Sequence, residues 1–141
     1  MKGINWLGVV LALVAGQLIG FAWYGFAFSE QWMALMGFTA EQIEGEGMMG
    51  MLYGALGQLI TAIGLGWLVA RLGEPTLMGG LKAALAACVF FAATTNANRF
   101  IYGMENPGLI PIDFGYLFIV YLAMGAVIGA VRLKPRVATL A

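Results

Sequence analysis

Arg99 lies in the stretch of this sequence whose side chains are best suited to chemistry. It follows Asn96 and Asn98, and it precedes Glu105 and Asp113. Amides, a guanidinium and two carboxylates can join in one charge-assisted hydrogen-bond network. We expect a polar cluster here. It either ties neighbouring segments together or binds a lipid headgroup, a small polar solute or a partner protein.

The residues that usually support catalysis or metal binding are scarce. The sequence has no histidine and one cysteine, Cys88, so Cys/His zinc sites and an internal disulfide are excluded. The crowded carboxylates Glu41, Glu44 and Glu46 lie in a polar stretch that is typical of a wet surface. We expect no catalytic residue, metal or cofactor. The alternative is an enzyme that acts on lipid through the polar groups near Arg99.

The composition indicates that these groups are carried by a membrane protein. Of 141 residues, 62% are hydrophobic and 10% are charged, whereas soluble domains carry about 25% charged residues. A soluble fold of this length could not bury so much apolar surface, so lipid must cover part of it. The net charge of zero argues against nucleic acid as a partner.

Four apolar runs are long enough to cross a bilayer as helices. We predict spans at about 4–28, 48–72, 77–100 and 113–132. Residues 73–75, Gly-Glu-Pro, form a tight turn between the second and third. The predicted fold is all-α: one integral membrane domain over residues 1–141, built as an antiparallel bundle of four transmembrane helices.

Residues 29–47 are the most polar segment and follow the first span. Thr39 and Gln42 have the spacing of a helix capping box, and Gly45 and Gly47 are expected to end the segment. Apolar residues alternate with polar ones here, which predicts a short amphipathic helix on the membrane surface. The aromatic residues expected at the interface are Trp23, Tyr24 and Trp32.

The charges separate by side. Six of the seven basic residues fall on one side of the predicted topology: Lys2, Arg71, Lys82, Arg132, Lys134 and Arg136. Six of the seven acidic residues fall on the other: Glu30, Glu41, Glu44, Glu46, Glu105 and Asp113. The positive-inside rule predicts that both termini are cytoplasmic and that the protein spans the inner membrane several times.

Few polar side chains lie inside the predicted spans: Gln17, Gln58, Thr61, Thr95 and Asn96. An amide in hydrocarbon is costly unless it is hydrogen-bonded. Gln17 and Gln58 are therefore expected either to bond each other or to line a path for a solute. Asp113 is expected to cap the fourth span at its start, and no acidic residue is expected deep within a span.

Glycine spacing predicts how the helices meet. Small residues four apart let membrane helices approach closely, and three spans carry such pairs: Gly16 with Gly20, Gly50 with Gly54, and Gly125 with Gly129. In the third span, Ala83 and Ala87 serve the same purpose. These faces either pack within one subunit or, for at least one of them, against a second subunit.

Several motifs together resemble a family of bacterial membrane proteins called domain of unknown function 1761. They are residues 5–7 (Asn-Trp-Leu), 23–25 (Trp-Tyr-Gly), 31–33 (Gln-Trp-Met), 95–96 (Thr-Asn), 109–116 (Leu-Ile-Pro-Ile-Asp-Phe-Gly-Tyr) and 124–129 (Met-Gly-Ala-Val-Ile-Gly). Where the family often carries a proline and a tryptophan, this chain has Gly25-Phe26 and Val131. The resemblance implies four helices and no assigned activity.

The sequence therefore predicts a non-enzymatic membrane protein that acts through helix–helix contacts. It would form a homo-oligomer or serve as an accessory subunit of a larger membrane complex. Its partners would be membrane lipids and other membrane subunits or itself. The alternative is a small oligomeric transporter or channel for a polar solute, with Gln17, Gln58, Asn96 and Arg99 along the route.

Overall fold

The computed structural model describes residues 3–131, except for the side chains of residues 40 and 44–46. The basic residues Lys2, Arg132, Lys134 and Arg136 lie outside this range, as does the end of the fourth predicted span. Over the described residues the chain forms helices and turns without a strand.

The helices follow one another along the chain with short connections. In order they are α1 (Trp6–Ala22), η1 (Trp23–Ala27), α2 (Ser29–Met36), α3 (Ala40–Leu72), α4 (Leu77–Ala87), η2 (Cys88–Ala93), α5 (Thr94–Ile101) and α6 (Leu109–Ala130). The two η segments are π-helices that continue α1 and α4. Four stretches are long and apolar enough to cross a membrane: Trp6–Ala27, Gly47–Leu72, Leu77–Ile101 and Leu109–Ala130. These are the features of a multi-pass membrane protein.

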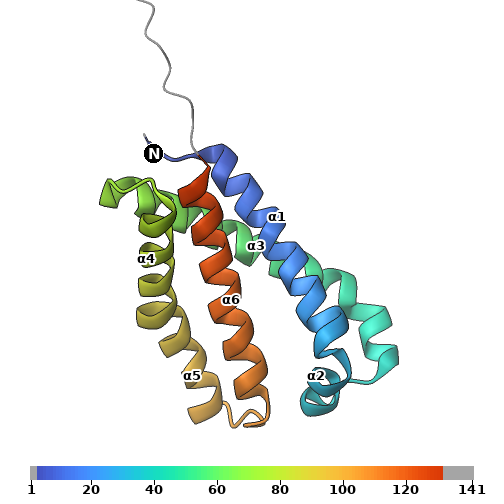
Figure 1. Cartoon of the computed structure of the whole chain (residues 1–141). Helices are drawn as coiled ribbons and strands as arrows, with labels where there is room; N and C mark the ends of the chain where they lie inside the picture. Colours follow the sequence, from blue (N-terminus) through green and yellow to red (C-terminus); the bar gives the residue numbers. More distant parts are fainter. Residues whose placement is uncertain (1–2, 132–141) are drawn as a thin grey trace, which may run out of the picture.

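Helix α6 lies at the centre of the bundle. It packs most extensively against α4 on one side and α1 on the other, and α3 crosses behind them (Figure 1). We call the end that holds the α3–α4 turn the Gly73 end, and the opposite end the α2 end. The buried core is made of aliphatic and small residues from α1, α3, α4 and α6: Val9, Ala12, Ala62, Leu65, Val69, Ala83, Ala84, Val120, Met124 and Ile128.

Glycines bring α4 and α6 into backbone contact. A Cβ atom on Gly80 would collide with the backbone of Gly125, and one on Gly129 would collide with that of Thr76. Ala84 packs onto Gly125 one turn further along. Because lipid tails are as apolar as the helix surfaces, such close backbone packing is a main source of stability inside a bilayer.

Asn5 joins the beginning of the bundle to its end. Its side-chain oxygen accepts a hydrogen bond from the Gly8 amide at 3.0 Å and so caps α1. Its amide nitrogen donates to the Val131 carbonyl at 2.5 Å, just beyond the last residue of α6. One side chain therefore fixes both α1 and α6 at the Gly73 end.

The capping box at Thr39 is present, but it begins a much longer helix than expected. Thr39 accepts from the Gln42 amide, and the Gln42 side chain bonds back to Thr39. Helix α3 then continues through Gly45 and Gly47 to Leu72 without a break, so the predicted end of the segment at these glycines is wrong. A single glycine inside a helix costs only about 1 kcal/mol, which neighbouring residues can offset.

The last span starts four residues earlier than predicted. Helix α6 begins at Leu109, after Gly108, and includes Pro111 in its first turn. Proline is tolerated there because the first amides of a helix have no partner within the helix. Asp113 consequently does not cap the helix, as we expected. It lies one turn inside the span and is buried.

Candidate functional site

The site begins at η1, where the last turn of the first span widens. The Phe28 amide donates to the Trp23 carbonyl at 2.9 Å, a bond between residues five apart. Such π segments often occur at functional sites because they change the direction in which side chains project. Here Trp23 donates from its indole nitrogen to the Ile112 carbonyl at 3.1 Å. The Tyr24 hydroxyl donates to the Asp113 carboxylate at 3.0 Å.

Asp113 is the meeting point of three spans. Its side chain comes from α6, Tyr24 reaches it from η1, and Arg99 reaches it from α5 with 3.6 Å between Nη1 and Oδ2. The residue is only 5% exposed. A carboxylate with so little water around it is retained only with hydrogen-bonding or charged partners, and this one has both.

Arg99 connects that buried carboxylate to the loop between α5 and α6. It binds Glu105 through two hydrogen bonds of 3.0 and 2.6 Å and the Asn96 side chain through a third of 3.1 Å. Met104 has a positive φ of 51°, which is uncommon for a residue with a side chain. This turn directs Glu105 back toward the helix, so the paired geometry depends on the loop as well as on α5.

The predicted cluster is thus assembled in part. Asn96, Arg99, Glu105 and Asp113 come together at the α2 end. Asn98 is exposed and is not brought into it. The intramembrane polar residue Thr95 is exposed on the same helix, near a surface hollow described below.

A second polar network lies deeper in the bundle. Gln17 of α1 donates to the Gln58 side chain at 2.7 Å. The Gln58 amide nitrogen in turn donates to the Gly16 carbonyl at 3.1 Å and to the Tyr116 hydroxyl at 2.5 Å. The two glutamines therefore bond each other, the first of the two expected alternatives, and join α1, α3 and α6. Thr61 bonds instead to the Gly57 carbonyl of its own helix at 3.0 Å.

Aromatic rings connect the two networks. Tyr24 and Tyr116 lie edge to face with their centroids 4.8 Å apart, and Trp32 of α2 packs on the other side of Tyr24 at 5.3 Å. Aromatic pairs of this geometry contribute roughly 0.5–1.5 kcal/mol beyond burial. The residues predicted as interfacial aromatics thus also hold α2 and η1 against α6.

The glycine pairs fall into two groups. A Cβ atom on Gly16 or Gly20 would meet Gln58, Met124 or Tyr116, and Gly125 and Gly129 contact α4. In contrast, a Cβ atom on any of four glycines of α3 would have no neighbouring atom within 4 Å: Gly50, Gly54, Gly57 and Gly64. The pair Gly50 and Gly54 therefore packs against no other helix among residues 3–131.

Sequence reasoning missed the tyrosine contacts. It assigned Tyr24 to the interface and gave Tyr116 no role beyond its motif, yet these hydroxyls bond Asp113 and Gln58. The available signal was a tyrosine within an apolar run close to a charged or amide residue, since a buried hydroxyl needs a partner. Which partner it takes depends on how the spans face each other.

Among the side chains that the structure describes, no three cysteine or acidic groups are close enough together to hold a metal ion. The polar groups of the two networks bond one another, and Cys88 is buried in the packing against α6. The observed geometry is that of cross-links between spans.

Comparison with known proteins agrees with the class defined by the fold, a multi-pass membrane protein. The chain matches the family described as Protein of unknown function (DUF1761) over residues 7–129. The chain belongs to this family, which the sequence motifs had indicated. No curated protein and no solved structure matches it.

Proposed function

We propose that this chain is a non-enzymatic membrane protein that acts through helix–helix contacts, and that its partner is a second copy of itself. The observation that carries the proposal is the open glycine face of α3. The four glycines follow one side of the helix at spacings of four, three and seven residues, and no described residue covers them: Gly50, Gly54, Gly57 and Gly64.

A second copy suits this face for two reasons. Small residues at this spacing allow two membrane helices to approach to backbone contact. In a two-fold dimer the same patch meets itself, so a charged patch would repel its copy. The four glycines and Thr61 between them carry no charge, and the Thr61 hydroxyl is already bonded to its own helix.

The topology that we propose is an antiparallel bundle. Gly80 faces Gly125 and Thr76 faces Gly129, so positions along α4 fall as positions along α6 rise, and successive spans alternate in direction in Figure 1. The short helix α2 would lie at the membrane surface. The charge separation in the sequence supports an inner-membrane location with the Gly73 end and both termini on the cytoplasmic side.

The transporter or channel is less well supported. A solute path needs polar groups that are free to bind the solute, whereas Gln17, Gln58 and Tyr116 bond one another. The same observation weighs against an enzyme, because the buried Asp113 carboxylate is engaged with Tyr24 and Arg99.

The test is the mass of the native particle in nanodiscs or mild detergent. We expect two copies for the unaltered chain and one copy for Gly54→Leu. Leu56→Trp is the matched control, because Leu56 is exposed on the other side of α3 and the added bulk should leave two copies. A single copy of the unaltered chain would contradict the proposal. A different protein of fixed stoichiometry at the α3 face would make the chain an accessory subunit instead.

A further inference from the structure

A shallow, open hollow lies on the surface beside η2, α5 and α6. It is lined by Phe91 and Ala92 of η2, by Thr95, Asn96 and Arg99 of α5, and by Tyr121 of α6. No residue of α5 is buried. The side chains that cross to α6 are Arg99, which reaches Asp113, and Phe100, whose ring lies 6.0 Å from that of Phe114.

The hollow has the length and the polarity of one membrane leaflet. Arg99 lies two residues from the end of its candidate span, where lipid headgroups begin. Phe91 lies eight residues deeper, or about 12 Å at the helical rise, and half of the hydrocarbon core is about 15 Å. Polar groups line the end near Arg99, and Phe91, Ala92 and Tyr121 line the deeper part. A phospholipid has the same order of polar and apolar parts.

The charges at the end of the hollow near Arg99 favour a particular headgroup. Glu105 and Asn96 occupy three of the five N–H groups of Arg99. Nη1 also lies 3.6 Å from Asp113, which leaves the second N–H of Nη2 to donate. Its side chain is still 43% exposed, and that of Glu105 is 30% exposed. The guanidinium can therefore donate to a phosphate, while Glu105 can accept from an ammonium group.

We propose that this hollow binds one phospholipid whose headgroup carries both a phosphate and a primary ammonium, as phosphatidylethanolamine does. The phosphate lies on Arg99, the ammonium on Glu105, and an acyl chain follows Phe91, Ala92 and Tyr121. One guanidinium between the carboxylates of Glu105 and Asp113 leaves a formal charge of minus one, which disfavours a lipid with net negative charge. A quaternary choline headgroup has no N–H to donate to Glu105.

The experiment is native mass spectrometry of the full-length protein, titrated with lipids that share acyl chains and differ in headgroup. We expect phosphatidylethanolamine to bind roughly five- to tenfold more tightly than phosphatidylcholine or phosphatidylglycerol, which corresponds to one hydrogen bond of ordinary net strength. Equal binding of all three, or tighter binding of phosphatidylglycerol, would overturn the proposal. Soluble phosphoethanolamine should not displace the bound lipid. If it does, the site binds the headgroup alone, and the proposal of a phospholipid site is wrong.

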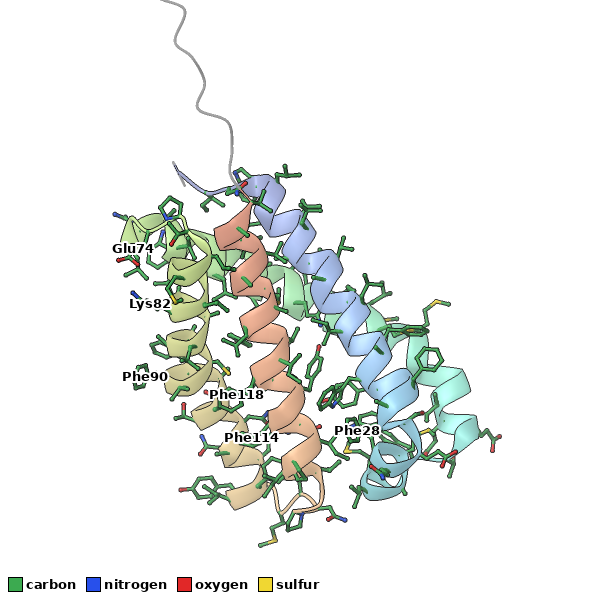
Figure 2. All side chains as sticks on the ribbon, in the orientation of Figure 1. Phe28, Glu74, Lys82, Phe90, Phe114 and Phe118 are labelled. Carbon is green, nitrogen blue, oxygen red and sulfur yellow. The ribbon has the colours of Figure 1, made fainter. Side chains whose placement is uncertain are left out.

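Two pairs of variants keep the test independent of folding. Arg99→Gln should abolish the headgroup preference, whereas Arg71→Gln, which removes an exposed charge of the same type at the Gly73 end, should keep it. Phe91→Ala should weaken binding of every lipid at this site, and Phe90→Ala should not. Phe90 and Phe91 are 69% and 72% exposed, and Phe90 projects away from the bundle (Figure 2). If Arg99→Gln unfolds the chain, the test rests on Phe91→Ala and Phe90→Ala. Equal lipid binding by these two variants would refute the proposal.

Discussion

The glycine pair of α6, Gly125 and Gly129, and the pair of α3, Gly50 and Gly54, have the same sequence spacing and opposite surroundings. Gly80, Gly125 and Gly129 lie where two backbones touch, and a side chain at any of them would collide with main-chain atoms. Gly54 and Gly57 face open space. The comparison teaches that a small-residue pair indicates a possible close approach between helices. Whether the other helix belongs to the same subunit depends on where the remaining spans lie.

The strongest test of this contrast is Gly125→Leu. Because the new side chain would meet Ala84 and the backbone of Gly80, α4 and α6 would have to separate. We expect a loss of about 3 kcal/mol or more of unfolding free energy. Thermal unfolding in detergent can be followed by labelling of Cys88, the single cysteine in the sequence and a buried one. If Cys88 of the variant became labelled at the same temperature as Cys88 of the unaltered protein, the contact between α4 and α6 would be dispensable.

Asp113→Ala tests whether the polar contacts between spans stabilise the subunit, as the packing of α4 against α6 does. The Tyr24 hydroxyl would lose its acceptor and Arg99 would keep Glu105, so we expect destabilisation of about 1–3 kcal/mol. Asp113→Asn retains an oxygen for Tyr24 and should cost less. The same Cys88 labelling measures both variants. Equal losses for the two would show that the charge, and not the Tyr24 bond, is what matters.

Gln58→Leu probes the inner side of α3, next to the open glycines. It removes the bonds to Gln17, Gly16 and Tyr116. Hydrogen bonds between membrane helices average about 0.6 kcal/mol, so we expect a loss of roughly 1–2 kcal/mol. The measurement is again the unfolding midpoint. A variant with full stability would indicate that the network contributes nothing beyond packing.

The smallest change, and the opposite sign, is expected for Gly54→Ala. Alanine favours the helix by up to about 1 kcal/mol over glycine, and the methyl group meets no atom within 4 Å. The unfolding temperature of the dissociated subunit should rise slightly, whereas Gly125→Ala should lower it. The protein is diluted in detergent until its subunits separate. A lower unfolding temperature for Gly54→Ala under these conditions would mean that this face is covered within one subunit after all.

The number of spans and the α2-end cluster could be predicted because each depends on local sequence. Hydrophobic runs define the spans, and Arg99 lies close in sequence to Asn96 and Glu105. The start of α6 was misplaced because Pro111 suggested a loop, although the first turn of a helix tolerates proline. The contacts of Tyr24 and Tyr116 could not be predicted, since they join residues 89 and 58 positions apart and depend on how the helices rotate against each other.

The π-helix η2 gives the third span one place where it can absorb a change in length. A π turn contains an extra residue relative to an α-helix. Deleting one residue between Cys88 and Ala93 would therefore leave a regular helix whose later residues keep nearly the same direction, with Arg99 still facing Asp113. A deletion in the regular helix α4 would instead turn every later residue by about 100° around the axis, and Arg99 would point away from Asp113. Single deletions should therefore be tolerated within η2 far better than within Leu77–Ala87.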